Sequence, residues 1–137
     1  MTTTQQSSTK LASAVDVVRD RHIAAVNAGD VEASVNQFAP DGVLLPPGAP
    51  VLSGAAAIRG WFTQVFGMFR VEDFNIQSAG VEQMGNIAIE HGRWSGTFHP
   101  KDGSAPITPG GTYLTVYALQ SDGRVLIIRD TFNGLPG

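Results

Sequence analysis

The hydrophobic pattern of this chain changes its period once, near Arg70, and that change limits the fold more than any other feature. Before Arg70 the apolar residues recur at the spacing of amphipathic helices; after it they fall in short runs rich in β-branched and aromatic residues. Helices followed by hairpin-linked strands predict an α+β domain, with the helices packed on one face of a largely antiparallel sheet. A chain of 137 residues is enough for one domain with a substantial core.

Three helices are predicted in the first half. Residues 11–28 form an amphipathic helix that ends at Gly29, a residue that often closes helices in a left-handed conformation. Asp30 is a good cap for a second helix, which Pro40 ends, and Ser53 is a good cap for a third. The apolar face of the second helix holds Val31, Val35 and Phe38, and that of the third holds Ile58, Trp61, Phe62, Val65, Phe66 and Phe69.

Strands are predicted for most of the second half, after a short one over residues 42–45. The predicted segments are 74–76, 87–98, 113–119 and 125–132. Turn signals separate these segments, at Gly80, at Gly85-Asn86, over 100–111 and over 121–123. Asp122-Gly123 is a strong signal for a two-residue hairpin, so the last two strands are expected to pair.

The composition excludes several classes of function. Lys and Arg number 9 and Asp and Glu 12, so the net charge of −3 gives no basic surface for nucleic acid. The absence of cysteine excludes disulfides, thiolate metal sites and a cysteine nucleophile. The three histidines, His22, His91 and His99, lack the spacing of metal ligands. We therefore expect neither a metal nor a cofactor.

Hydropathy and charge give the expected setting of the domain. No apolar run approaches the roughly 18 residues of a membrane span, and the polar first ten residues carry no secretory signal, so no membrane association and a cytoplasmic location are expected. Residues 1–10 are predicted to be a flexible tail and residues 11–137 a single domain. Charged residues are only 15% of the chain, which predicts that a partner or a second copy covers part of the surface.

Five short motifs are similar to those of one known family. They are Asn27-Ala28-Gly29-Asp30, Phe38-Ala39-Pro40-Asp41, Ser53-Gly54-Ala55-Ala56-Ala57-Ile58-Arg59 before Trp61-Phe62, Asp122-Gly123-Arg124, and Ile128-Arg129-Asp130-Thr131-Phe132-Asn133. Over residues 11–133 the chain resembles the nuclear transport factor 2-like superfamily, in its SnoaL-like and ketosteroid isomerase-like branch. The resemblance implies a cone-shaped, cystatin-like barrel, with three helices around a strongly curved sheet and a deep apolar pocket. It also implies a homodimer formed through the outer sheet face.

His22 is the first candidate for a catalytic residue. It lies in the apolar stripe of the first helix, four residues from Val18 and four from Val26. The resemblance places it where ketosteroid isomerases carry a tyrosine that donates to the developing oxyanion. His22 could donate there or act as a general base near neutral pH. The alternative is a packed histidine bonded to a backbone carbonyl.

His91 and Arg93 are the next candidates, on the strand over 87–98. Alternation puts them on one face with Ile89, and puts Glu90 and Trp94 on the other. The resemblance implies that the face of His91 and Arg93 lines the pocket. The face of Trp94 would then meet a second sheet in the homodimer, beside Leu114, Val116 and Ala118.

Asp130, in the last strand, is the predicted acid partner of Arg93, because a buried guanidinium needs an acid or an anionic ligand. An Arg93–Asp130 pair beside His91 resembles the arginine and acids with which limonene epoxide hydrolases activate water, although His91 stands where that pattern has a second carboxylate. The alternatives are a buried ion pair that only bridges two strands, or three side chains in solvent.

A second set of residues is predicted to bind the ligand. The resemblance places Thr115 where ketosteroid isomerases carry one of their two acids, and Pro46 close to where they carry the other, so steroid isomerisation itself is not expected. The predicted ligand-binding residues are Tyr113, Thr115, Tyr117, Trp61, Phe62, Phe66, Ile89, Phe132 and Met84.

These features predict a cofactor-free acid–base enzyme of the cyclase, isomerase, dehydratase or hydrolase type. His91, Arg93, Asp130 and His22 would act on a hydrophobic, polyketide- or steroid-like small molecule. Three alternatives stay open: a non-catalytic protein that binds a lipophilic ligand, an enzyme that activates water as epoxide hydrolases do, and a structural dimerisation domain whose cavity has collapsed.

Overall fold

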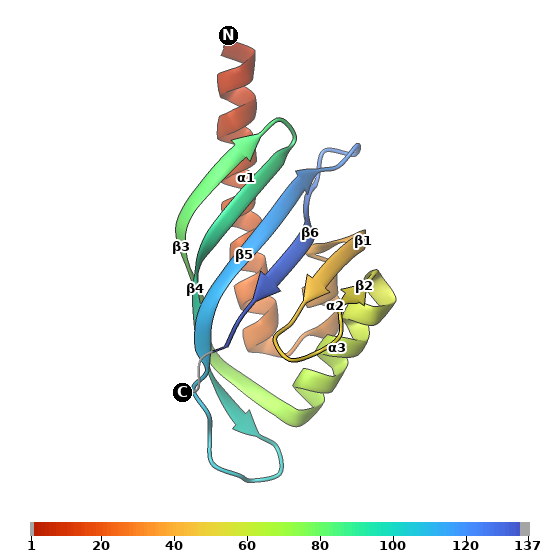
Figure 1. The fold of residues 1–137 in the computed structure, drawn as a ribbon, viewed down its shortest axis with the longest axis vertical. Coiled ribbons are helices and arrows are strands. Elements are labelled where there is room, and N and C mark those ends of the chain that lie inside the picture. Colours follow the sequence, from red (N-terminus) through yellow and green to blue (C-terminus); the bar gives the residue numbers. More distant parts are fainter. Residues whose placement is uncertain (1, 135–137) are drawn as a thin grey trace.

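The computed structural model describes residues 2–134 and shows the predicted order of helices and then strands (Figure 1). The helices are α1 (Thr2–Ala28), α2 (Val31–Val35) and α3 (Ala55–Met68). The strands are β1 (Phe38–Leu45), β2 (Leu52–Ser53), β3 (Phe69–Met84), β4 (Ile87–Pro100), β5 (Gly110–Leu119) and β6 (Val125–Phe132). The α+β class predicted from the change of period is confirmed.

All six strands belong to one sheet, in the order β2-β1-β6-β5-β4-β3. Strand β1 pairs with β6 in parallel, and every other pair of neighbours is antiparallel. The helices lie against one face of this curved sheet, as Figure 1 shows. None of the described helices is long and apolar enough to cross a membrane.

The helix boundaries differ from the prediction at two of the three starts. Helix α1 begins at Thr2 rather than at Leu11, so residues 2–10 are helical where the sequence predicts a tail. The prediction relied on apolar spacing, whereas an established helix gains one backbone hydrogen bond per added residue whatever its side chains. Helix α3 is capped by Gly54, with φ of 90°, because Ser53 pairs with Val43 in the β1–β2 ladder.

Helix α2 starts as predicted but ends early. The Asp30 carboxylate accepts a hydrogen bond from the Ala33 backbone N–H at 3.0 Å, which confirms the predicted cap. The helix stops at Val35, and Phe38 is the first residue of β1 rather than part of a helical face. Pro40 therefore lies within β1, where the pairing with β6 shifts its register between Phe38 and Val43.

Strand β3 is much longer than the predicted segment and includes Gly80 rather than turning there. Its pairing with β4 shifts register at two places, and Asp73, with φ of 56°, lies in the first. The Asn27 side chain accepts from the Phe74 N–H at 2.8 Å and donates to the Phe74 carbonyl at 3.0 Å. These bonds fix α1 against the irregular part of β3, at one wall of the interior.

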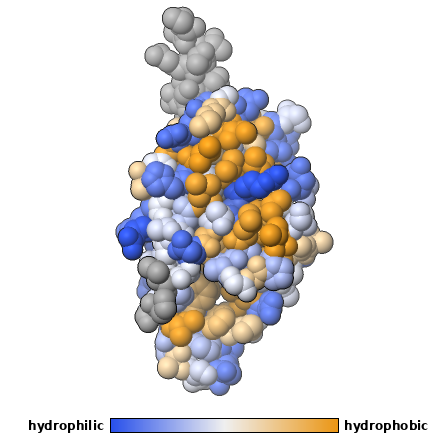
Figure 2. Space-filling model, in the orientation of Figure 1, coloured by the Kyte–Doolittle hydropathy of each residue, from blue (hydrophilic) through white to orange (hydrophobic). Residues whose placement is uncertain are grey.

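The core lies between the helices and the inner face of the sheet. Val15 of α1 and Ile58 of α3 have no exposed surface, and Leu44 of β1 has 1%. The outer face is also partly apolar: Figure 2 shows hydrophobic side chains gathered over the strands on the side away from the helices. Leu114 is 42% exposed there and Ile87 36%.

Candidate functional site

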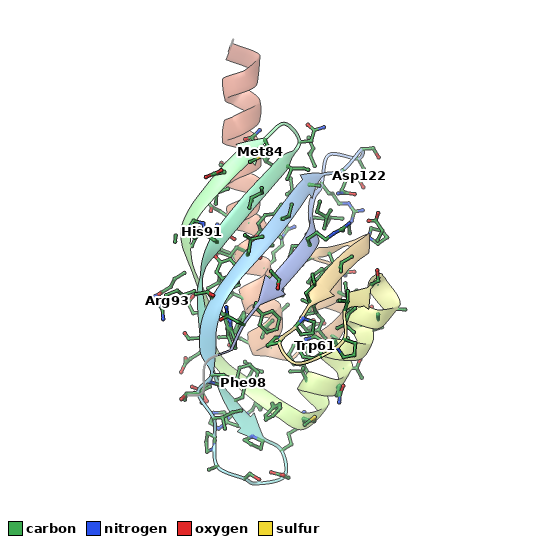
Figure 3. The ribbon with its side chains drawn as sticks, in the orientation of Figure 1. Trp61, Met84, His91, Arg93, Phe98 and Asp122 are labelled. Carbon is green, nitrogen blue, oxygen red and sulfur yellow. The ribbon has the colours of Figure 1, made fainter. Side chains whose placement is uncertain are left out.

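The inner face of β4 carries the opposite set of residues from the one predicted. Ala88, Glu90 and Gly92 are buried, whereas His91 and Arg93 are exposed on the outer side of the strand (Figure 3). The predicted inward facing of His91 and Arg93 is therefore wrong, and neither side chain meets Asp130.

The strand register explains this correction. Glu90 of β4 is paired with Thr115 of β5, so even-numbered residues of β4 share a face with odd-numbered residues of β5. Tyr113, Thr115 and Tyr117 face inward, as the sequence predicts. With this register His91 cannot share their face, because side chains of paired residues point to the same side of a sheet.

A cavity of about 310 Å³ lies between α1, α3 and the inner face of the sheet. Its size is that of a small-molecule site, so the predicted alternative of a collapsed cavity is excluded for this structure. Nine of the residues predicted for the site border it: His22, Trp61, Phe62, Phe66, Tyr113, Thr115, Tyr117, Asp130 and Phe132.

Two other predicted ligand-binding residues lie elsewhere. Ile89 is on the outer face of β4, and Met84 is 58% exposed at the far end of β3. Trp94, predicted to face a dimer partner, instead borders the cavity. Its indole N–H donates to the Asn133 carbonyl at 2.9 Å. The facing of Ile89 and Trp94 is reversed for the same reason as that of His91.

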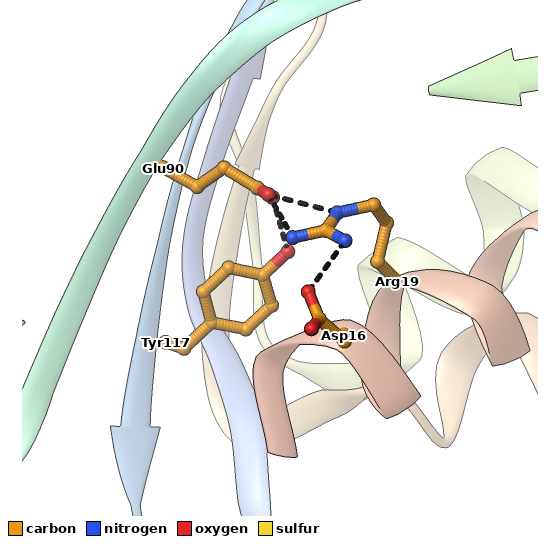
Figure 4. Close-up of polar contacts among 4 residues, drawn as sticks. All are labelled: Asp16, Arg19, Glu90 and Tyr117. Carbon is orange, nitrogen blue, oxygen red and sulfur yellow. Dashed lines mark hydrogen bonds and ion pairs between the residues drawn. The ribbon is translucent and has the colours of Figure 1, made fainter. Parts of the chain in front are cut away.

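A buried carboxylate, Glu90, forms the centre of a polar cluster at one side of the cavity (Figure 4). Its Oε1 accepts from the Tyr117 hydroxyl at 2.8 Å, and its Oε2 accepts from Arg19 Nε at 2.8 Å and also from Arg19 Nη2. Arg19 Nη1 donates in turn to Asp16 Oδ1 at 2.8 Å. The Glu90 side chain is fully buried, and Arg19 is only 13% exposed. Both oxygens of Glu90 are thus satisfied within the protein.

The environment of this cluster raises the pKa values of both Arg19 and Tyr117. Burial opposes the charged form of Arg19, but the hydrogen bonds to Glu90 and Asp16 outweigh it and raise the pKa of the guanidinium. Burial, together with the charge of Glu90, raises the pKa of the Tyr117 hydroxyl. Because its pKa is raised above the usual 10, the Tyr117 hydroxyl stays protonated and remains a hydrogen-bond donor near neutral pH.

Asp130 of β6 has a different environment. Its Oδ1 accepts from Thr115 Oγ1 at 2.8 Å, and Oδ2 has no hydrogen-bond partner in the part of the chain that the structure describes. Burial raises the pKa of Asp130 from 3.8 to about 7; the Thr115 hydrogen bond opposes this rise, and the charge of Glu90 adds to it. A carboxyl with a pKa near neutrality, bordering an apolar cavity, can both take and give a proton.

His22 borders the same cavity from α1. Its ring lies edge-on to Phe38, Phe62 and Phe74, with centroids 6.1 to 6.2 Å apart. Its Nδ1 is buried and has no hydrogen-bond partner among residues 11–134, so it is not bonded to a backbone carbonyl as one interpretation predicts. Burial lowers the pKa of His22 to about 4, so the imidazole is neutral at pH 7.

Tyr113 completes the polar lining. Its hydroxyl is buried and has no hydrogen-bond partner among the same residues. Burial and the nearby charge of Glu90 raise the pKa of Tyr113 to about 12, so the group remains a phenol. Gly92, paired with Tyr113, makes room for the ring: a Cβ there would come within 2.8 Å of the hydroxyl oxygen and 2.1 Å of the Gln77 carbonyl oxygen.

The described residues contain no group of three His, Asp or Glu side chains that could hold a metal ion. His99 instead pairs with Glu72 at 2.8 Å on the surface. Among the polar atoms of the side chains that border the cavity, Asp130 Oδ2, His22 Nδ1 and the Tyr113 hydroxyl have no hydrogen-bond partner among the described residues.

Two members of the site, Glu90 and Arg19, were not predicted from the sequence. The family resemblance places His91 and Arg93 in the pocket, which leaves Glu90 on the outer face with Trp94. The signal that could have placed it inside is the pair of small residues on either side of it on the same face, Ala88 and Gly92. Small residues in a strand often mark a close approach of other side chains.

With this geometry defined, comparisons with known proteins place the chain in a family. The SnoaL-like domain family matches residues 20–127. The chain belongs to this family. Its nuclear transport factor 2-like fold, which commonly binds small hydrophobic molecules and includes isomerases, agrees with the resemblance predicted from the motifs. No curated protein matches the chain.

Solved structures resemble this SnoaL-like domain closely in fold and only distantly in sequence. A conserved protein of Planctomyces limnophilus has a TM-score of 0.83 and 17% identity, over 92% of this chain and 97% of its own. A ketosteroid isomerase-like protein of Erwinia carotovora atroseptica has a TM-score of 0.82 and 20% identity, over 91% and 96%. A putative aromatic ring hydroxylase of Novosphingobium aromaticivorans has a TM-score of 0.74 and 25% identity, over 90% and 88%.

Proposed function

We propose that this protein is a cofactor-free acid–base enzyme that transfers a proton on a hydrophobic small molecule, with Asp130 as the catalytic acid and base. The observation that carries the proposal is the state of Asp130: a carboxyl on an apolar cavity, with one oxygen held by Thr115 and a pKa raised to about 7. Proton transfer is the step shared by cyclisation, isomerisation, dehydration and hydrolysis, the reactions predicted from the sequence.

Thr115 orients Asp130 in this proposal. Its hydroxyl donates to Oδ1, which leaves Oδ2 as the oxygen that takes the proton. A general base works best when its pKa is near the working pH, because enough of it is then ionised and it still binds a proton well. The other carboxylate of the site, Glu90, is held by Arg19 and Tyr117 and is not assigned a proton-transfer role.

His22 is proposed to assist as a neutral hydrogen-bonding group. Its buried Nδ1 has no partner among the described residues, and its lowered pKa keeps the ring uncharged at neutral pH. A neutral imidazole can donate from one nitrogen and accept at the other. It would bind an oxygen on the substrate on which charge develops as Asp130 takes the proton.

The substrate proposed is a flat, hydrophobic ring system of the polyketide- or steroid-like kind. Every Phe, Tyr and Trp of the chain except Phe38 borders the cavity, which favours planar apolar molecules. Because His91 and Arg93 lie on the outer face, no role in the reaction is proposed for them, nor water activation by an Arg93–Asp130 pair.

The base-promoted ring opening of nitrobenzisoxazole tests this proposal without knowledge of the natural substrate. In that reaction a base takes the proton from a ring carbon, the N–O bond breaks and a cyanophenolate forms. We expect the protein to accelerate it, with a rate that rises through about pH 7 as Asp130 ionises, and Asp130→Asn to abolish the acceleration. The exposed Glu82→Gln removes a carboxylate outside the cavity and should leave the rate unchanged.

A specific observation also favours the non-catalytic alternative: the Glu90, Arg19 and Tyr117 groups are satisfied by one another and need no chemistry to explain them. If nitrobenzisoxazole is opened no faster with the protein than with Asp130→Asn, while both bind it, the protein is a binding module and the acid–base proposal is wrong.

We also propose that two copies pair through the outer sheet face. The support is the apolar surface there, to which Leu114, Val116 and Ile87 contribute. The proposed interface includes His91 and Arg93 in place of Trp94. Light scattering should show a dimer at about micromolar concentration, and Leu114→Lys should convert it to monomer. A monomeric wild-type protein would refute the interface. The cytoplasmic location stays a prediction.

A further inference from the structure

The side chains that border the cavity include an acid without a cationic partner, Asp130, but no cation without an acidic partner. Of the side chains that border it, Arg19 alone carries a permanent positive charge. Each of the three guanidinium nitrogens of Arg19 already donates to a carboxylate, Nε and Nη2 to Glu90 and Nη1 to Asp16. His22 is neutral at pH 7. An anionic ligand would find here no cation whose charge is not already paired with a carboxylate.

Asp130, in contrast to Arg19, has no partner of opposite charge among the described residues. Its Oδ2 has no hydrogen-bond partner among the described residues, and the hydroxyl of Thr115 occupies only Oδ1. A ligand that brings a positive charge to Oδ2 would compensate a carboxylate that now lacks an ionic partner. A carboxylate or phosphate on the ligand would instead be repelled by Asp130 and by Glu90.

The rest of the lining also suits a cation. Trp61, Trp94, Phe74 and the tyrosines are among the aromatic side chains that border the cavity. The faces of aromatic rings attract organic cations, most strongly where water is excluded. Acidic and aromatic groups together, without a free basic group, form the type of site that binds protonated or alkylated amines.

We propose that the natural ligand is a hydrophobic amine, whose ring system fills the aromatic part of the cavity and whose protonated nitrogen donates to Asp130 Oδ2. This inference rests on the proposed small-molecule function and specifies its substrate class. It reverses the ligand charge expected from the sequence, which placed Arg93 in the cavity as a partner for an acid or an anionic ligand. The bound cation would also favour the ionised form of Asp130.

Three probes that share one ring system test the inference: naphthylmethylamine, naphthylmethanol and naphthoate, which are cationic, neutral and anionic at about pH 8. Calorimetric titration into the wild-type protein should give the tightest binding for the amine and the weakest for the carboxylate. The ratio of these two affinities should be about ten- to a hundredfold, the range of one charge-assisted hydrogen bond.

Two variants assign the selectivity to its source. Asp130→Asn keeps the shape of the side chain and removes its charge, so the amine should then bind no better than the alcohol. Glu82→Gln, an exposed change on β3, should keep the wild-type ratio.

The inference is overturned if naphthoate binds as tightly as the amine, or if Asp130→Asn leaves their ratio unchanged. If that happens while the opening of nitrobenzisoxazole still depends on Asp130, only the amine inference fails and the acid–base proposal stands. If none of the three probes binds, both fail.

Discussion

Two carboxyl groups lie in the same row across the inner face of the sheet, and their environments differ in nearly every respect. Glu90 on β4 is paired with Thr115 on β5, which is paired with Asp130 on β6. Glu90 is held by a guanidinium and a phenol, whereas Asp130 has only the Thr115 hydroxyl. The same row of the sheet thus holds one acid bonded to a cation and another whose pKa is raised to about 7.

The difference arises from α1 rather than from the sheet. Arg19 extends from that helix to Glu90, and His22, on the same helix, is a neutral group that compensates no charge. A buried acid with a cationic partner is a structural element, because the pair must stay intact. A buried acid without one keeps its ability to exchange a proton, which is the property that catalysis needs.

Removing the partner of Glu90 should have the largest effect. Arg19→Met keeps the length of the side chain and leaves a fully buried carboxylate without its cation, which we expect to lower the free energy of unfolding by about 3–5 kcal/mol. Urea denaturation near neutral pH measures it. The control is Asp16→Asn, which removes only an exposed partner and should change stability by less than about 0.5 kcal/mol. A loss below about 1 kcal/mol in Arg19→Met would show that Glu90 does not depend on Arg19.

Removing the charge of Asp130 should have an effect of the opposite sign and of at most similar size. Its pKa is about 7 in the folded protein against an ordinary 3.8, so the folded state binds the proton more tightly than the unfolded chain. The contribution of Asp130 to stability should therefore fall as pH rises from about 4 to about 7 and then stay level, whereas the lowered pKa of His22 acts in the opposite sense in both proteins. The difference between Asp130→Asn and wild type isolates Asp130: the two should be equally stable near pH 4, and the variant more stable by about 4 kcal/mol near pH 8. Equal stability of the two proteins at both pH values would refute the raised pKa.

Removing the hydroxyl of Thr115 should alter Asp130 without changing any charge. The Thr115 hydrogen bond favours the ionised carboxylate, so Thr115→Val should raise the pKa of Asp130 by about one unit. The midpoint of the pH–rate profile for nitrobenzisoxazole would move upward by that amount. Thr131→Val, a neighbouring exposed change on β6, should leave the midpoint in place. A shift of equal size in both variants would mean that the profile does not report Asp130.

Removing a charge from the outer face should have the smallest effect. Arg93→Gln changes a side chain exposed on β4 and should alter stability by less than about 0.5 kcal/mol, with no change in the nitrobenzisoxazole rate. A loss of rate in Arg93→Gln would mean that the facing of β4 in solution is the one predicted from the sequence.

The sequence alone predicts the fold class and several local features correctly. The Asp30 cap follows from a short-range pattern, since the capping side chain and the N–H it binds are three residues apart. The pairing of β5 with β6 agrees with the Asp122-Gly123 signal, and Gly123 has a φ of 90° that suits glycine, but residues 120–124 join the strands and the predicted two-residue turn is not formed. Signals of this kind depend on neighbours within a few residues and can be recognised without the tertiary structure.

Which residues of β4 point into the cavity depends on how β4 pairs with β5, and residues close in the sequence do not determine that pairing. Residues 101–109 separate β4 from β5, and a connection of that length does not fix the register between them. A register change of one residue exchanges the two faces, which is enough to move His91 out of the cavity and Glu90 into it. The partner that makes a buried Glu90 tolerable, Arg19, is 71 residues away in the sequence.

The most direct test of the account is a carbon NMR titration of the aspartate carboxyl groups in the wild-type protein and in Asp130→Asn. We predict one carboxyl resonance with a midpoint near pH 7, which is absent from the spectrum of the variant. If every aspartate of the wild-type protein titrates below about pH 5, Asp130 is an ordinary acid and the proposed role for it is wrong.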